Sequence, residues 1–200
     1  MCTDAIDLSE IRVSNIVCHF KLDREIESQI QTTLQGRIKA SARGTKKYAN
    51  FFVQYPNSKG SIVFTIFRHH VNITGLRSFK VIPFAIQTFK DNFQLPAELN
   101  IDPIINNICA STQLVRSHTK EPCDVALMRI AQLPESRFIP DLFAGLTLQF
   151  RSKEHGVHGT VVLFKSAKMN ILGCKSLNDV EKIAEMVKSL LCQHNCFLIE

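Results

Sequence analysis

Residues 143–175 read FAGLTLQFRSKEHGVHGTVVLFKSAKMNILGCK and contain three short apolar runs separated by polar or glycine-bearing segments. The runs are LTLQF (146–150), GTVVLF (159–164) and KMNIL (168–172), and their alternation predicts an antiparallel β-meander. Side chains alternate between the two faces of a strand. One predicted face carries the apolar set Val161, Leu163, Met169 and Ile171. The other face carries the mixed set Val162, Phe164, Asn170 and Leu172.

The mixed face points to an external partner, because it keeps a phenylalanine and aliphatic side chains among lysines and asparagines. An apolar sheet face with a basic rim suits the minor groove of duplex DNA. The charge distribution favours the same kind of partner. The 200 residues carry a formal charge of +6, and ten Lys or Arg residues but no acidic residue lie between Glu27 and Asp91. This one-signed segment predicts a partner rich in phosphate.

The second half of the chain repeats the element order of the first. The first half predicts, in order, a strand over 11–20, a helix over 22–34 begun by Asp23, a loop over 36–47, strands over 48–55, 61–67 and 71–74, and a helix over 78–93. The second half predicts a strand over 104–114, a helix over 121–132, an exposed connection over 136–142, the meander, and a helix over 176–192 begun by Ser176 or Asn178.

Four pairs of landmarks support a tandem duplication. They are Asn15 with Asn107, Tyr48 with Phe143, Phe67 with Phe164, and VNITG (71–75) with MNILG (169–173). The members of each pair are separated by about 92–98 residues, and the separation grows slowly along the chain, as small insertions require.

Two β-α-β-β-β-β-α repeats predict an α+β fold, namely a pseudo-twofold saddle whose curved antiparallel sheet carries four helices on its convex face. The predicted limits are a leader over 1–10, a first repeat over 11–95, a linker over 96–103, a second repeat over 104–192 and a tail over 193–200. Phe51 is expected in the core.

Other classes of protein receive less support from the sequence. No apolar run approaches the roughly 20 residues that span a bilayer, and the first residues are unlike a signal peptide. Seven cysteines without a regular framework indicate reduced thiols in a nuclear or cytosolic protein. An enzyme is not predicted, because His118, Cys123 and Asp124 lie close in sequence without a catalytic order. The run CQHNC (192–196) holds three zinc-ligand types, but a frayed helix end with incidental thiols is favoured over a zinc site. No cofactor is expected.

Residues 11–192 resemble the core domain of the TATA-box-binding protein family. The resemblance is most specific in SRFIPDLFAGL and VVLFKSAKMNILGCK, which parallel the family's stirrup and its LIF-x-SGK-x-V-x-TGAK pattern; in the first half the anchors are SNIV, KLD and ITG. A divergent member, such as a virus-encoded copy, would carry drift of this kind. The resemblance implies a transcription initiation factor that binds and bends DNA through the minor groove. It implies a location in the nucleus, or in a cytoplasmic viral factory.

The resemblance also implies roles for individual residues. The intercalating aromatics would be Tyr48, Phe67, Phe143 and Phe164, with a shallower kink at the Tyr48 end. The minor-groove contacts would be Asn15, Val17, Asn72, Thr74, Asn107, Cys109, Val162, Asn170 and Leu172. Phosphate would be met by Arg43, Lys46, Lys47, Arg68, Lys165 and Lys168. A general transcription factor (TFIIB-like) and the RNA polymerase machinery would dock at Ile139, Asp141 and Leu142.

Several departures from the family pattern carry expectations of their own. Asn72 and Asn170 stand where the family has valine, and an amide oxygen accepts a hydrogen bond from the exocyclic amine of guanine, so some G·C pairs should be tolerated. Gln54 and Gln149 replace phosphate-binding arginines, and Ile139 replaces an acidic residue. Weak self-association through the concave face is a further expectation. The alternative function is a module of the same fold that grips a protein or substrate without kinking DNA.

Overall fold

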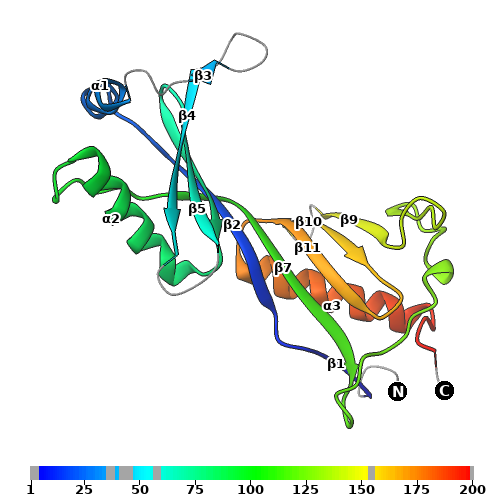
Figure 1. Cartoon of the computed structure of the whole chain (residues 1–200). Coiled ribbons are helices and arrows are strands. Elements are labelled where there is room, and N and C mark those ends of the chain that lie inside the picture. Colours follow the sequence, from blue (N-terminus) through cyan, green and yellow to red (C-terminus); the bar gives the residue numbers. More distant parts are fainter. Residues whose placement is uncertain (1–4, 35–38, 41–46, 56–59, 153–155, 199–200) are drawn as a thin grey trace. The chain divides into compact units, whose positions relative to one another are not determined.

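The computed structural model describes residues 5–34, 39–40, 47–55, 60–152 and 156–198; at 39–40, 47–48 and 152 it describes the backbone. The chain divides into two compact units, and each is described by itself (Figure 1). We call residues 15–106 the first unit, and residues 1–14 with 107–200 the second unit. This division cuts two strands within their length, so the repeat limits set from the sequence remain predictions. No helix in the described part of the chain is long and apolar enough to span a bilayer.

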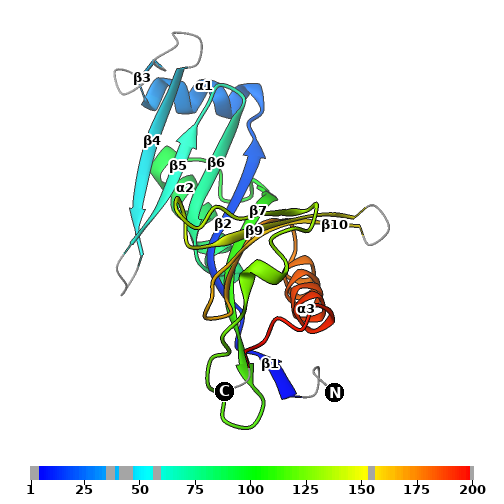
Figure 2. The same cartoon turned by 90° about the vertical axis from the view of Figure 1, so that its right-hand side faces the viewer.

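The first unit is an antiparallel sheet with two helices. Its elements are β2 (Arg12–Lys21, in this unit from Asn15), α1 (Arg24–Thr33), β3 (Lys39–Ala40), β4 (Lys47–Gln54), β5 (Ser61–Ile66), β6 (His70–Leu76), the 3-10 turn η2 (Phe79–Val81) and α2 (Ile82–Phe93). The strands lie in the order β3-β4-β5-β6-β2 (Figure 2). As expected, the side chain of Asp23 caps α1 by accepting from the Ile26 amide at 2.8 Å, and Pro83 sits in the first turn of α2.

Phenylalanines form the core of the first unit between the sheet and α2. The Phe89 ring lies 5.2 Å from Phe20 on β2 and 5.4 Å from Phe64 on β5 (centroid distances). Phe51 is half-buried and packs against Phe64 at 5.6 Å and Phe93 at 6.1 Å, so its side chain lies on the core side of the sheet, as expected. Aromatic pairs at these separations add to the free energy gained by removing the rings from water. The face of this sheet that carries Phe20 and Phe64 therefore packs against α2.

The second unit is also an antiparallel sheet backed by a helix. Its elements are β1 (Ile6–Leu8), β7 (Ile104–Arg116, in this unit from Asn107), the 3-10 turn η3 (Leu127–Arg129), β8 (Ser136–Arg137), β9 (Leu146–Ser152), β10 (Val157–Leu163), β11 (Lys168–Cys174) and α3 (Leu177–Gln193). The order is β7-β11-β10-β9-β8, and β1 pairs with β7. The predicted meander is β9, β10 and β11. Ser176 and Asp179 form a capping box at the start of α3.

Helix α3 covers one face of β10 and β11 (Figure 1). Val180, Ile183 and Val187 on the helix are fully buried. Gly159 allows the close approach, because a Cβ at this position would lie 2.4 Å from Ile183 Cδ1. The predicted division of the meander is confirmed. The apolar set Val161, Leu163, Met169 and Ile171 is fully buried, whereas Val162, Phe164, Asn170 and Leu172 are half-buried or exposed.

Part of the expected leader is a strand. Ile6–Leu8 pair with Leu114–Arg116 as β1, the Ile6 side chain is buried, and Lys120 Nζ donates to Asp7 Oδ2 at 2.7 Å. This hydrogen bond lowers the pKa of Asp7. Composition gave no sign of this pairing, because three residues are too few to show a period.

The predicted helix over 121–132 is wrong. In this segment only the 3-10 turn Leu127–Arg129 is helical, and the preceding residues are extended. The backbone finds partners elsewhere, since the Val125 amide donates to the Lys165 carbonyl and the Ala126 amide to the Cys196 carbonyl. Cys123, Val125 and Leu127 are all buried, which is the two-residue period of an extended chain. The α+β class is confirmed, with α1, α2 and α3 in place of four helices in the described part of the chain.

Candidate nucleic-acid interface

The face of the second unit opposite α3 is open and ordered in rows. Across β7, β11, β10 and β9, the strand register places in one row Ser111, Asn170, Val162 and Thr147. The next row contains Leu172, Thr160 and Gln149, and the outermost row pairs His158 with Arg151. All of these side chains are half-buried or exposed. The first two rows are neutral and the outermost row is basic, which is the arrangement needed to meet base edges beside phosphates.

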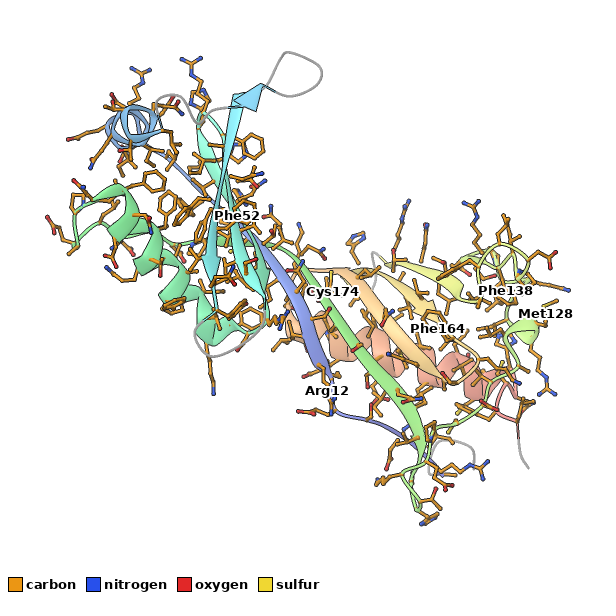
Figure 3. All side chains as sticks on the ribbon, viewed as in Figure 1. Arg12, Phe52, Met128, Phe138, Phe164 and Cys174 are labelled. Atoms are coloured by element: carbon orange, nitrogen blue, oxygen red, sulfur yellow. The ribbon has the colours of Figure 1, made fainter. Side chains whose placement is uncertain are left out.

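Phe143 and Phe164 form an aromatic pair at the edge of this open face. Their ring centroids are 6.0 Å apart and the rings are inclined by 71°. Phe143 is 53% exposed and Phe164 is half-buried. Phe164 directly follows β10 (Figure 3), and its amide donates to the Lys168 carbonyl at 2.9 Å. Both rings therefore lie outside the core under α3, at a fixed turn, and are available to a partner.

Gly145 makes room for the Phe143 ring. A Cβ at this position would lie 2.6 Å from Phe143 Cε1 and 2.7 Å from Val162 Cγ1. We expect Gly145→Ala to displace the ring, and so to reduce the DNA bending that the resemblance implies, while changing the melting temperature little. Gly159→Ala, on the helix side of the same sheet, should instead lower stability by about 1–3 kcal/mol through overpacking. Fluorescence bending assays and thermal unfolding separate the two effects, and equal bending by G145A and the wild type would contradict this geometry.

The first unit presents a comparable open face. One row of its register contains His19, Asn72, Thr65 and Asn50, and the next contains Thr74, Val63 and Phe52. Beyond the end of β5, the half-buried Phe67 ring stacks on His70 with centroids 4.6 Å apart. Tyr48 pairs through its backbone with Lys39, but its side chain lies outside the described residues.

The paired asparagines hold equivalent bulges in the two units. Asn15 Oδ1 accepts from the Gly75 amide, and Asn107 Oδ1 accepts from the Gly173 amide, both at 2.8 Å. The two glycines have φ of 84° and 85°, and the strand register shifts at both places. Because each carboxamide oxygen is occupied, each nitrogen end is left as the donor; in Asn107, Nδ2 contacts Cys109 Sγ at 3.4 Å. Amide donors beside an open sheet face suit the acceptors on the minor-groove edges of bases.

Comparisons with known proteins agree with this geometry. Residues 102–194 match the family model described as Transcription factor TFIID (or TATA-binding protein, TBP). The second half of the chain therefore carries a TATA-binding protein domain. The fold of both units is also similar to the solved structure of Methanococcus jannaschii TBP, with a TM-score of 0.65 and 21% identity over 92% of this chain and 99% of that chain. No curated protein matches significantly in sequence. The family is one of DNA-binding transcription factors and is not an enzyme family.

Most of the residues assigned from the resemblance to the TATA-binding protein family lie on the two open faces. The first unit contributes Asn15, Val17, Phe67, Asn72 and Thr74, and the second contributes Asn107, Cys109, Phe143, Val162, Phe164, Asn170 and Leu172; all are half-buried or exposed. Their contacts with DNA remain a prediction.

The predicted phosphate contacts have different surroundings. Lys165 and Lys168 are exposed beside Phe164. Arg68 is exposed, and its Nε donates to Glu27 Oε1 at 3.4 Å. Arg43 and Lys46, and the side chain of Lys47, lie outside the described residues. The Arg68 side chain is 80% exposed, so it remains accessible to phosphate.

The predicted docking residues of the second unit lie beside a cavity of about 510 Å³. Ile139 and Leu142 line this cavity together with Arg137 and Phe143. Leu142 is 81% exposed, and Asp141 beside it is also exposed. The connection thus offers apolar side chains next to Phe143.

Sequence reasoning missed two features of the open faces. Arg151 and His158 form the outermost row of the second unit, two residues beyond Gln149 on the same face of β9. Phe52 is 59% exposed on β4 (Figure 3). Strict alternation from Gln149 would have found Arg151, and alternation from Phe51, on the core side of β4, would have found Phe52.

Within the described residues, no three His, Cys, Asp or Glu side chains converge as metal ligands.

Burial raises the pKa of the Cys18 and Cys174 thiols to about 11. Cys109 is half-buried on the open face. We therefore expect native-state alkylation at pH 8 to modify Cys109 well before Cys18 and Cys174, because the thiolate is the reactive form. Bound duplex DNA should protect Cys109, and mass spectrometry of alkylated peptides would show it; equal labelling with and without DNA would contradict the assigned face.

Proposed function

We propose that this protein binds double-stranded DNA through the minor groove and bends it, acting as a transcription initiation factor with relaxed preference for A·T sequence. The observation that supports this most strongly is the Phe143–Phe164 pair, exposed at the edge of a neutral sheet face with basic residues at its ends. An exposed aromatic pair on a fixed turn has little to contribute to folding. It is suited to insertion between stacked bases.

In this mechanism the two rings act as one wedge. Partial insertion of Phe143 and Phe164 at a base step would unstack that step, which costs a few kcal/mol. The bend opens the groove and lets the row that contains Asn170 and the row that contains Leu172 approach the base edges. The added contact area offsets the unstacking cost. Phe67 and Tyr48 would act in the same way for the first unit, with a shallower kink.

Asn15 and Asn107 would read the groove as donors. Their amide oxygens are held by the Gly75 and Gly173 amides, so only the nitrogen ends face a ligand. Adenine N3 and thymine O2 are the acceptors in the minor groove. We expect Asn107→Asp to weaken binding by about tenfold or more, because a carboxylate offers no donor and repels phosphate. An aspartate variant with wild-type affinity in an anisotropy titration would contradict this role.

Asn72 and Asn170 would relax the sequence preference. Both lie in the first row of an open face, where each can turn its amide oxygen toward the guanine amine. An unbiased duplex selection should return sites with G·C at the positions read by these rows. Selection with Asn72→Val and Asn170→Val should return a stricter A·T consensus, and identical consensus sequences would contradict the hypothesis.

Protein partners would dock at the connection that holds Ile139, Asp141 and Leu142. Its exposed apolar side chains support an apolar contact with a TFIIB-like factor that brings the RNA polymerase machinery to bent DNA. A nuclear location, or a viral factory in the cytoplasm, would follow from that role. Weak self-association through the open faces in the absence of DNA belongs to the same proposal, because these faces expose Phe143 and Leu172.

A gel shift with duplex DNA at two salt concentrations tests the proposed function. Each phosphate contact should contribute roughly −0.9 to the slope of log K, the association constant, against log salt concentration. Arg151→Gln should reduce this slope by about 1 if its row meets phosphate. A protein-gripping module of the same fold would show no steep salt dependence and no bending, and that result would refute the proposal.

A further inference from the structure

Phe52 is the most exposed phenylalanine on the open face of the first unit. Its side chain is 59% exposed, compared with 53% for Phe143 in the second unit. The other exposed phenylalanines of the first unit, Phe79 and Phe84, belong to η2 and α2. The neighbouring Phe51 points to the opposite face and packs on Phe64 and Phe93. The core thus uses Phe51 and leaves Phe52 without a packing role.

The nearest neighbours of Phe52 on the open face are uncharged. Its cross-strand partner is Val63, which in turn lies opposite Thr74. Along β4 its neighbours on the same face are Asn50 and Gln54, both exposed. No Lys, Arg, Asp or Glu belongs to this row or to the Asn50 row, whose other members are Thr65, Asn72 and His19. An apolar ring held among short side chains would bury its surface only against a partner.

The corresponding row of the second unit has a different chemistry. In the first unit, Val63 lies four residues before Phe67 and pairs with Phe52. In the second unit, Thr160 lies four residues before Phe164 and pairs with Gln149. The fold therefore does not require an aromatic residue in this row. The difference between Phe52 and Gln149 distinguishes the two open faces.

We infer that Phe52 is a further DNA-contacting residue that excludes the guanine amine from one part of the site. This inference rests on the proposed function. Phe52 lies in the middle of a strand, whereas Phe67 and Phe164 follow strand ends, so its ring lies along the base edges and is not a wedge. A phenyl ring offers no acceptor to the exocyclic amine of guanine, which projects into the minor groove. The row of Asn72 tolerates this amine, and the row of Phe52 rejects it.

Single-site replacement of adenine by 2,6-diaminopurine provides the test, because it adds the minor-groove amine without changing the pairing partner. A duplex that the full chain binds is scanned one base pair at a time by anisotropy. We expect wild-type affinity to fall roughly tenfold at one or two adjacent positions, as for one mismatched base pair. In Phe52→Gln these positions should lose most of their sensitivity while the rest of the profile is unchanged.

Two matched variants sharpen this test. Phe84→Ala removes an exposed phenylalanine of the same unit from α2 and should leave the whole profile as in the wild type. Gln149→Phe should create a new amine-sensitive position in the other half of the site. If wild-type protein binds and bends DNA but F52Q has the wild-type profile, this inference fails and the proposed function stands. If the wild type binds no duplex, both fail.

Discussion

Replacing Phe143 and Phe164 together by alanine is expected to abolish bending of DNA at one end of the site. The two ring centroids are 6.0 Å apart, with Phe143 exposed and Phe164 half-buried at the edge of the open face. Aromatic contacts with bases contribute about 1–3 kcal/mol each. The double variant should therefore lose roughly 2–6 kcal/mol of binding free energy, and fluorescence transfer between labelled duplex ends should fall toward that of free DNA.

The control for this experiment is the pair of single variants Phe67→Ala and Phe84→Ala. Phe67→Ala removes the wedge of the first unit and should reduce bending in part. Phe84→Ala should change neither bending nor affinity, because Phe84 lies on α2. A double variant that bends DNA as the wild type does would show that the exposed pair is not the wedge.

Gly75→Ala is expected to have the largest effect on stability. Gly75 has φ of 84°, and a Cβ there would lie 2.5 Å from the Ser61 carbonyl oxygen. Left-handed backbone costs roughly 1–2 kcal/mol for an alanine, and a contact with rigid backbone adds about 1–3 kcal/mol. We therefore expect the free energy of unfolding to fall by about 2–5 kcal/mol.

Gly173→Ala is the matched control at the equivalent bulge. Its φ is 85°, but the nearest atom to an added Cβ is Gly159 Cα at 3.8 Å. Only the cost of the left-handed backbone applies, so the free energy of unfolding should fall by about 1–2 kcal/mol. Denaturant titration of both variants would measure the difference, and equal losses would show that the Ser61 contact relaxes without cost.

Most helices and strands could be predicted because their starts or their buried faces depend on residues close together in the sequence. Asp23 and Ser176 begin their helices, and the alternation in 159–172 separated the buried Val161 and Ile171 from the open face. These features depend on neighbours in sequence. The helix over 121–132 failed because its backbone partners, Lys165 and Cys196, lie far along the chain. The strand Ile6–Leu8 was missed for the same reason, since it depends on pairing with β7.

The candidate site could be predicted only in part. The positions of Phe143, Phe164 and the two asparagines came from the resemblance. The orientation of the amides did not, because it depends on the hydrogen bonds from Gly75 and Gly173. Phe52 was passed over because it adjoins the core residue Phe51 in sequence, and two consecutive phenylalanines look alike until the strand assigns them to opposite faces.

Binding to a duplex in which every A·T pair of a selected site is replaced by I·C is the most direct test of minor-groove recognition. Inosine and cytosine change the major-groove pattern but present the same minor-groove acceptors without an amine. The account predicts an affinity within about threefold of the original site. Loss of affinity to the level of random DNA would show that the protein does not read the minor groove.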